Sequence, residues 1–302
     1  MTLTEIRQLL SERGIRLTKS LGQNFLHDRN QLRRIVEAAE LAPRDKVIEV
    51  GPGLGQLTEL LVARAGTVLA IEKDARLVQL LHERFGAPAG LVRAQADSSG
   101  NVGAGLGALP SQCPAGLVLI HADALEFFRT QRRGWRSWKM VSNLPFSVAS
   151  PILVEVAQLG ACPRRLVVTV QFEVAQRLTA VPARPEYGVL TLMVGLTYAP
   201  VTMFKIPAGC FFPTPNVDAA CIVLERRSPP LLPAAQRLVF VRVVKRAFSQ
   251  RRKMMFKLLK HDWPEDKLAR AFDHAGLGRA ARAEQVGLEG FVELTRALCA
   301  ES

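Results

Sequence analysis

The chain has 302 residues, of which 48% are hydrophobic and 22% are charged. These proportions are those of folded soluble proteins and exclude a largely disordered chain, and the length leads us to expect two unequal domains. The formal net charge is +13, and residues 226–302 alone contain 16 Lys and Arg against 8 Asp and Glu. A basic excess concentrated in one region favours a polyanionic partner, nucleic acid before membrane, with a merely basic soluble surface as the alternative.

The N-terminal segment and the cysteines bear on localisation. Residues 1–20 place Ile6, Leu9 and Leu10 at helical spacing among charged residues, which predicts an amphipathic helix and not a signal peptide. No apolar run approaches the roughly 20 residues that span a bilayer. The five cysteines are odd in number and form no CxxC pair, so neither a zinc site nor a disulfide framework is indicated. We therefore expect a cytoplasmic protein with no metal and no membrane partner.

From residue 46 onward, short β-branched runs alternate with segments of helical periodicity. Strands are predicted at VIEV (47–50), TVLAI (67–71), LVLI (117–120), MVSN (140–143) and RLVVTV (165–170). Crossover helices are expected at 56–65 and 77–81, and a further strand at 218–225 is expected to close the sheet. This alternation predicts a Rossmann-like α/β fold, a parallel sheet with helices on both faces.

Proline-rich and glycine-rich segments divide the chain. Pro229, Pro230 and Pro233 mark a linker, so we expect a catalytic-type domain at 1–228 with an N-terminal helical extension, and a small basic helical domain at 229–302. Residues 95–116 are rich in Gly, Ser, Ala and Pro and predict a surface loop, to which we assign no function.

A glycine-rich turn follows the first predicted strand of the sheet. Gly51, Gly53 and Gly55 alternate with Pro52 and Leu54, and such glycines let the backbone approach a ligand at the carboxyl edge of a parallel sheet. Glu72 ends the next strand, where a carboxylate can accept the hydroxyls of a ribose. The pattern predicts a nucleotide-type pocket.

The identity of the cofactor depends on residues around this turn. A dinucleotide fingerprint, GxGxxG, requires glycine where this chain has Gln56. The observed ExGxGxG, led by Glu49, suits S-adenosylmethionine, which has no pyrophosphate to place at a helix N-terminus. A purely structural turn is the alternative, but Glu72 and the following helix favour a cofactor site.

Asn143-Leu144-Pro145-Phe146 follows the fourth predicted strand. The Asn side-chain oxygen and the carbonyl of Leu144 or Pro145 can accept the two hydrogens of an amino group on an aromatic ring, and the Phe ring can stack on that ring. Such acceptors stabilise the positive charge that develops on an amine nitrogen under attack on a methyl donor, without a strong base or a metal. Taken alone, the four residues also fit a tight turn after a strand.

Five segments together resemble the ribosomal RNA adenine N6,N6-dimethyltransferase family, the KsgA/RsmA type. They are KSLGQNFL (19–26), EVGPGLGQLT (49–58), NLPFSVASPIL (143–153), FKIPAGCFFPTPNVDAA (204–220) and KRAFSQRRKMM (245–255). The resemblance implies a class I methyltransferase fold that uses S-adenosylmethionine to dimethylate two adjacent adenosines near the 3′ end of small-subunit rRNA. The partner implied is small-subunit rRNA in a pre-ribosomal particle, with a role in its assembly, and we expect a monomer.

The resemblance also implies roles for individual residues. The expected cofactor-binding residues are Asn24, Leu26, Gly51, Gly53, Glu72, Asp123 and Asn143. The expected catalytic residues around the target base are Asn143, Leu144, Pro145, Phe146 and Phe212. Asp123 is preferred to Asp97 as the contact to the adenine of the cofactor, because an apolar strand precedes it.

Phe146 stands where bacterial members of the family usually have Tyr. Phe keeps the stacking face, so activity is expected to survive. The substitution also brings the chain closer to the mitochondrial transcription factor B proteins and to the large-subunit erythromycin-resistance methylases.

A basic segment runs from Arg242 to Lys260, with eight basic residues and no acidic one. The spacing of its basic and apolar residues predicts one helix with a phosphate-facing side, and a solvated basic face is the alternative. The predicted RNA-binding residues are Arg242, Arg246, Arg251, Arg252, Lys253 and Lys257.

Three rival functions remain at this stage. A non-catalytic assembly or transcription factor would keep the fold without the chemistry, but Glu72, Asp123 and Asn143 are all present. A DNA or protein amino-group methylase typically has NPP[YF], whereas this chain has Leu144 at the second position. A nicotinamide oxidoreductase would require the third glycine of its fingerprint.

Overall fold

The computed structural model describes residues 1–15, 17, 22–86, 94–95, 116–130, 134–250 and 252–300. Asp97, Arg251 and nearly all of the expected loop at 95–116 lie outside the described residues. The chain forms two compact units, one of Met1–Phe172 with Val201–Glu225 and one of Glu173–Pro200 with Arg226–Ser302. The second segment of the second unit begins close to the expected boundary at 228. Residues 173–200, which we had placed in the first domain, group instead with the C-terminal helices.

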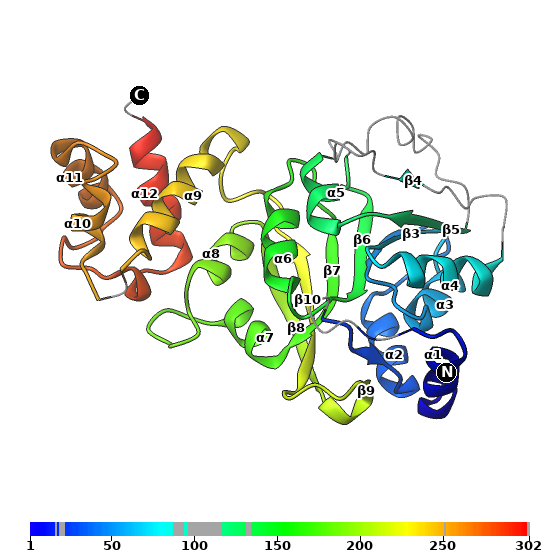
Figure 1. The fold of residues 1–302 in the computed structure, drawn as a ribbon. Helices are drawn as coiled ribbons and strands as arrows, with labels where there is room; N and C mark the ends of the chain where they lie inside the picture. Colours follow the sequence, from blue (N-terminus) through cyan, green and yellow to red (C-terminus); the bar gives the residue numbers. More distant parts are fainter. Residues whose placement is uncertain are drawn as a thin grey trace. The chain divides into compact units, whose positions relative to one another are not determined.

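The first unit contains an eight-stranded sheet in the order β4-β5-β3-β2-β6-β7-β10-β8 (Figure 1). The first six strands in this order, from β4 to β7, are parallel to one another, and β10 is antiparallel to β7. The bounds are β2 Lys46–Val50, β3 Thr67–Glu72, β4 Ala94–Gln95, β5 Gly116–His121, β6 Trp138–Asn143, β7 Arg165–Gln171, β8 Tyr198–Ile206 and β10 Ala219–Arg226.

All the strands predicted from the β-branched runs are confirmed, and two expectations about the sheet are wrong in detail. The sheet is mixed, because β10 runs against β7. Strand β10 also does not close the sheet, since β8 lies outside it. The sequence of β8 was missed because four of its successive side chains, residues 200–203, are exposed, so it shows neither alternation nor an apolar run.

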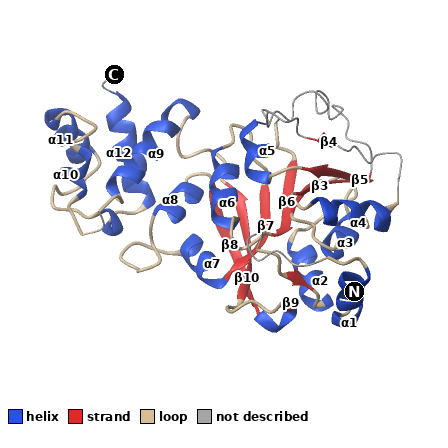
Figure 2. Ribbon diagram, viewed as in Figure 1, coloured by secondary structure: helices blue, strands red, loops and turns tan. Residues whose placement is uncertain are grey.

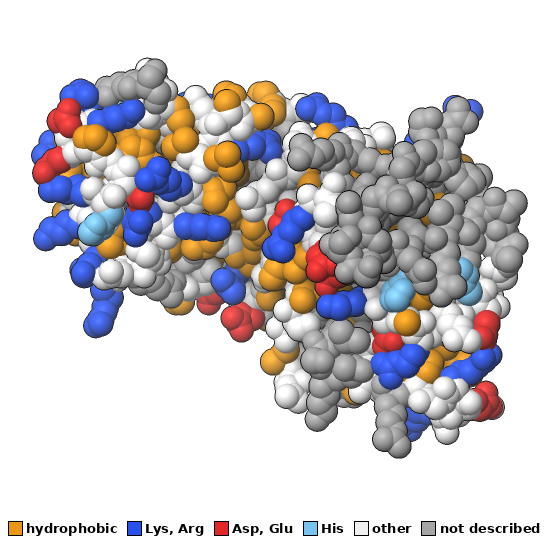
Figure 3. Space-filling model, turned by 45° about the horizontal axis from the view of Figure 1, so that its top comes forward, with side chains coloured by type: hydrophobic (Ala, Val, Ile, Leu, Met, Phe, Trp, Pro, Cys, Tyr) orange, Lys and Arg blue, Asp and Glu red, His pale blue; other side chains and the backbone are white. Residues whose placement is uncertain are grey.

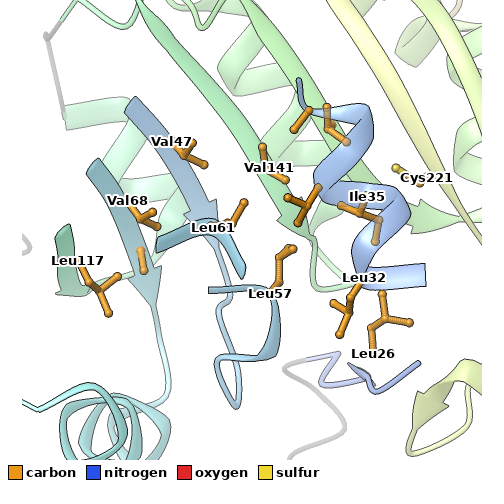
Figure 4. Close-up of a cluster of buried hydrophobic side chains, with 14 of the residues drawn as sticks. Leu26, Leu32, Ile35, Val47, Leu57, Leu61, Val68, Leu117, Val141 and Cys221 are labelled. Carbon is orange, nitrogen blue, oxygen red and sulfur yellow. The ribbon is translucent and has the colours of Figure 1, made fainter. Parts of the chain in front are cut away.

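Helices cover both faces of this sheet (Figure 2). They are α2 Arg29–Ala38, α3 Gln56–Val62, α4 Ala75–Phe85, α5 Ala124–Thr130 and α6 Ala149–Gln158. Helix α2 begins where the Asp28 carboxylate accepts a hydrogen bond from Gln31 N at 2.9 Å, which satisfies one unpaired N–H of the first turn. Its Leu32 and Ile35 belong to one cluster of buried side chains with Val47 and Val141 of the strands (Figure 4). Alternate strand residues, such as Ile48 and Met140, are also fully buried, so both faces of the sheet contribute to the core.

The order of the strands determines where a ligand can bind. The chain passes from β2 to β3 on one side of β2, whereas β6 lies on the other side. In an open parallel sheet such a reversal leaves a crevice at the carboxyl ends of the two central strands. Gly51 follows β2 and Asn143 ends β6, so the two predicted motifs meet at this crevice.

The N-terminal segment packs beside the carboxyl ends of the strands. Helix α1, Leu3–Glu12, has a capping box formed by Thr2 and Glu5 and buries Ile6 and Leu10, which confirms the predicted amphipathic helix. After it, β1 (Phe25–Leu26) pairs antiparallel with β9 (Phe211–Phe212). Two segments of the family resemblance that are nearly 190 residues apart therefore lie side by side.

The second unit is helical within its described residues. Its helices are α7 Phe172–Thr179, which starts at the last residue of the first unit, α8 Val189–Gly195, α9 Arg237–Ala247, α10 Met255–Leu259, α11 Glu265–His274 and α12 Leu288–Ala300. No helix of the described chain is both long and apolar enough to cross a membrane.

The single basic helix expected from 242 to 260 is wrong, because α9 ends at Ala247 and α10 begins at Met255. Met254 is extended and forms an antiparallel bridge with Arg282, and Met255 N donates to Ala281 O at 2.9 Å. This pairing to a distant segment takes the chain out of the helical conformation, a tertiary contact that periodicity does not reveal.

Candidate active site

A cavity lies at the carboxyl ends of β2, β3 and β6, with a volume of about 1040 Å³ including space open to solvent. Every residue predicted to bind the cofactor lines it, together with two of the predicted catalytic residues: Asn24, Leu26, Gly51, Gly53, Glu72, Asp123, Asn143, Leu144 and Pro145.

The glycine turn after β2 forms one wall of the cavity. Gly51 and Gly53 have φ values of +67° and +59°, which L-residues with a side chain rarely adopt. A Cβ on Gly51 would lie 3.1 Å from Pro145 Cγ, and one on Gly53 would lie 2.9 Å from two ring carbons of Phe25. The turn is therefore packed so closely against β1 and the segment after β6 that side chains have no room.

Glu72 lies at the end of β3 and is held by backbone donors. Its Oε2 accepts from Gly53 N at 3.2 Å, and its Oε1 accepts from Lys73 N and Asp74 N, both at 2.9 Å. Burial raises the pKa of Glu72 despite these hydrogen bonds. The carboxylate is thus fixed in orientation beside the glycine turn, and Oε2 keeps one lone pair for a ligand.

Three buried polar atoms without a partner belong to residues that line the cavity. Glu49 Oε2, Gln56 Nε2 and Asn143 Oδ1 are inaccessible to solvent and have no hydrogen-bond partner in the structure, and all three residues line the cavity. Burial, reinforced by the nearby Glu72 carboxylate, raises the pKa of Glu49 to about 8. Such groups are costly unless a ligand satisfies them. Glu49 and Gln56 are site residues that sequence reasoning did not assign to the cofactor, although Glu49 leads the glycine motif.

Asp123 precedes α5 and also lines the cavity. Its Oδ1 accepts from Leu125 N at 2.8 Å, and its Oδ2 forms an ion pair with Lys73 Nζ at 2.9 Å. Burial opposes ionisation, but Lys73 and the backbone donors outweigh it and lower the pKa of Asp123. Asp123 is therefore a carboxylate at neutral pH. Its rival from the sequence, Asp97, lies outside the described residues.

The Asn143 side chain has a defined orientation. Its Nδ2 donates to the carbonyl of Asn24 at 3.0 Å, which leaves Oδ1 without a partner. Leu144 N donates to Thr169 O at 3.1 Å, and Val148 N donates to Pro145 O at 3.1 Å, so the turn after β6 is held at both ends. The arrangement uses one amide N–H for support and leaves the buried Oδ1 as an unused acceptor of a residue that lines the cavity.

The two predicted aromatic residues do not line the cavity. Phe146 is half-buried and packs edge-on against Phe211, with ring centroids 6.0 Å apart. Phe212 lies under the guanidinium of Arg7, 5.5 Å from its ring centroid, against the side chains of α1. The structure therefore pairs Phe146 with Phe211 and not with Phe212. The contact of Phe212 with the target base stays a prediction.

The predicted RNA-binding residues of the second unit fall into two groups. Arg242 and Arg246 both form ion pairs with Asp262, and Arg242 also lies over the ring of Trp263. Arg252, Lys253 and Lys257 are exposed, and Arg251 lies outside the described residues. Figure 3 shows Lys and Arg side chains spread over the C-terminal helices on the face it presents. The expected single basic stripe is thus replaced by an anchored pair and a separate exposed group.

Comparisons with known proteins agree with this geometry. The profile of the family described as ribosomal RNA adenine dimethylase matches residues 14–94 and 114–298. The chain belongs to this family. The resemblance inferred from the five sequence segments is confirmed.

Individual members of the family are similar to this protein over nearly the whole length of the chain. "Ribosomal RNA small subunit methyltransferase A" of Moorella thermoacetica is 34% identical, covering 96% of this chain and 95% of its own. The protein of the same name from Bacillus thuringiensis is also 34% identical, covering 98% and 96%.

Two solved structures show the same fold. The 23S rRNA methyltransferase ErmE has a TM-score of 0.62 at 28% identity, over 91% of this chain and 99% of its own. A dimethyladenosine transferase from Plasmodium falciparum has a TM-score of 0.66 at 19% identity, over 89% and 95%. The expected class I methyltransferase fold is confirmed. As a ribosomal RNA adenine dimethylase, the protein is a methyltransferase, and enzymes of this class use S-adenosylmethionine.

Proposed function

We propose that this enzyme transfers two methyl groups from S-adenosylmethionine to the N6 amine of each of two adjacent adenosines near the 3′ end of small-subunit rRNA. The observation that carries the proposal is the meeting of the glycine turn after β2 and the unpartnered Oδ1 of Asn143 in one cavity. The curated relatives at 34% identity, named as small-subunit rRNA methyltransferases, support the choice of RNA.

The cavity fits the cofactor by its shape and by its polar groups. The turn at Gly51 and Gly53 excludes side chains where a ligand must approach the backbone closely. The unpartnered Glu49 Oε2 and Gln56 Nε2 offer hydrogen bonds that the chain itself does not use. We assign the methionine portion to Gly51 and Gly53, the ribose to Glu72 and the adenine to Asp123, with Asn24 and Leu26 as the cover. When bound, S-adenosylmethionine supplies a methyl group on a positively charged sulfur.

Asn143 is the proposed acceptor for the target amine. Because its Nδ2 is committed to Asn24 O, its Oδ1 is the atom presented to an N6 hydrogen. Pro145 O already accepts from Val148 N, so the carbonyl of Leu144 is our choice for the second hydrogen. Two acceptors pull the planar amine toward tetrahedral geometry and stabilise the charge that develops on nitrogen.

Phe146 is the proposed stacking surface for the target base. An adenine must leave its stack before methylation, at a cost of a few kcal/mol, and stacking on an aromatic ring returns about 1–3 kcal/mol. The edge-on contact with Phe211 fixes the Phe146 ring from one side. Phe212, which lies against Arg7, stays a proposed contact to the target base.

The exposed Arg252, Lys253 and Lys257 are the proposed phosphate contacts of the second unit. Arg242 and Arg246 are also at the surface, but Asp262 neutralises part of their charge, so we assign them mainly to holding this basic region in place. The proposed substrate particle is a small-subunit assembly intermediate, and we propose that the enzyme acts on it as a monomer without a metal.

Mass spectrometry of rRNA from cells lacking this gene tests the proposal. Dimethyladenosine should disappear from small-subunit rRNA, return with the wild-type gene, and stay absent with Asn143→Ala. Retention of the modification in the deletion strain would refute the substrate assignment.

A large-subunit adenine methylase is the second candidate, favoured by the likeness to ErmE and by Phe146. Loss of methyladenosine from large-subunit rRNA, with small-subunit rRNA unchanged, would identify that function. Complementation of a growth or assembly defect by Asn143→Ala would instead indicate a non-catalytic role.

A further inference from the structure

The two central strands of the sheet separate just before the cavity, and one side chain spans the gap. Backbone pairing between β2 and β6 runs from Lys46↔Trp138 to Ile48↔Met140 and then stops. If the register continued, Val50 would lie opposite Ser142. There the Ser142 hydroxyl donates to Val50 O at 2.6 Å and accepts from Val50 N at 3.2 Å.

This bridge is completely inside the protein. Ser142 is 0% exposed and Val50 is 2% exposed. A buried backbone donor or acceptor without a partner costs about 1–3 kcal/mol. A hydroxyl is the smallest side-chain group that can donate and accept at once, so Ser142 replaces the backbone bonds that the separated strands no longer make.

The bridge stands one residue before each half of the site. Val50 leads directly into Gly51, which is the wall of the cofactor cavity, and Ser142 leads directly into Asn143, which carries the unpartnered Oδ1. The spacing between these walls sets how far the amine acceptor lies from the cofactor turn. No other side chain in the described residues is hydrogen-bonded to both backbone groups of Val50.

We infer that Ser142 is a positioning residue for methyl transfer, whose hydroxyl fixes the separation between the glycine turn and Asn143. The inference rests on the proposed function, because the two walls need a fixed separation only if a methyl group passes between them. A misplacement of about 1 Å between reacting groups can cost about 100-fold in rate, whereas each ligand still binds to its own wall.

The decisive comparison uses two variants of equal shape. Ser142→Thr keeps the hydroxyl and Ser142→Val lacks it, and both add the same bulk to a buried position. Thr295→Val is the matched control, because it removes a fully buried hydroxyl that donates to Phe291 O at 2.8 Å in α12 and that does not line the cavity.

Four measurements are made on the full-length protein with small ribosomal subunits as substrate. Single-turnover methylation gives the rate of transfer, steady-state kinetics give KM for subunits, and calorimetry gives Kd for S-adenosylhomocysteine. Hydrogen exchange reports the protection of the Val50 amide.

The Val variant should transfer methyl groups about ten- to 100-fold more slowly than the Thr variant, with similar KM and Kd values. The Val50 amide should lose protection only in the Val variant. The Thr295 control should lose stability and keep its transfer rate.

Equal transfer rates in the Thr and Val variants would overturn the inference, as would a rate loss that merely follows thermal stability across all three variants. If neither β-branched variant folds, Ser142→Ala against wild type provides the same comparison of rate with KM and Kd. Failure of the proposed function gives a different result, since wild-type enzyme would then leave small-subunit rRNA unlabelled.

Discussion

Two glycines with similar positive φ angles offer a sharp test of the cofactor site. Gly53 in the turn after β2 has φ +59°, and Gly276 after α11 has φ +63°. Alanine at either position should cost about 1–2 kcal/mol through the left-handed conformation alone. A Cβ on Gly276 would have no neighbour within 4 Å, whereas one on Gly53 would lie 2.9 Å from Cδ1 and Cε1 of Phe25. Only the Gly53 variant must therefore move a neighbouring side chain.

The displaced Phe25 makes this clash a test of function as well as of stability. Phe25 is 6% exposed, so its ring has little room to move. Forcing a Cβ against this ring should lower the free energy of unfolding by a further 1–3 kcal/mol approximately. Because Phe25 stands between Asn24 and Leu26, its movement should disturb both and weaken cofactor binding about tenfold, which corresponds to about 1.4 kcal/mol. Urea unfolding and calorimetry with S-adenosylmethionine measure the two effects. Equal stabilities for Gly53→Ala and Gly276→Ala, with wild-type affinity in both, would refute the packing argument.

Three further predictions concern charge and stacking. Burial raises the pKa of Glu49 to about 8, so the folded protein keeps a proton that the unfolded chain releases near 4.5. The protonated Glu49 side chain therefore makes its full contribution to stability below pH 4.5, and this contribution is lost as the pH rises through 8. Glu49→Gln should remove this loss of stability with pH, as measured by urea unfolding of the ligand-free protein. Arg246→Ala should lower the melting temperature, because it removes one of the two partners of the nearly buried Asp262. Lys257→Ala should leave the melting temperature unchanged and should weaken rRNA binding in a filter assay. Phe146→Tyr should methylate at near wild-type rate, and Phe146→Ala should lose about tenfold or more in kcat/KM on small subunits.

The parts of the fold that the sequence predicts are those that local pattern determines. The buried strands β2, β3, β5 and β7 are short runs rich in Val, Ile and Leu, which is the pattern expected of strands covered on both faces. Strand β8 is an edge strand with exposed side chains on both faces and has no such pattern. The break between α9 and α10 is set by the bridge from Met254 to Arg282, a tertiary contact that the hydrophobic periodicity of the sequence does not predict.

The site residues divide in the same way into those that local sequence pattern predicts and those that tertiary contacts determine. Gly51, Glu72 and Asn143 were identifiable because parallel strands place their carboxyl ends at one edge, so residues far apart in sequence converge there. Ser142 gave no signal, since its role depends on the register at which β2 and β6 separate. Phe211 and Phe212 are neighbours of the same type, and only the pairing of β9 with β1 shows which ring meets Phe146.

Asp262 shows why a count of charges overstates the RNA-binding surface. The stretch from Arg242 to Lys260 contains no acid, yet the carboxylate two residues beyond it takes both Arg242 and Arg246 as partners. Each phosphate contact contributes about 0.7–0.9 to the slope of log affinity against log salt. Six free cations in this region would give a slope near 5, whereas the four predicted contacts other than Arg242 and Arg246 would give about 3–4. Binding of rRNA by the second unit should therefore be only moderately sensitive to salt, and specificity for the target adenosines must come from the cavity in the first unit.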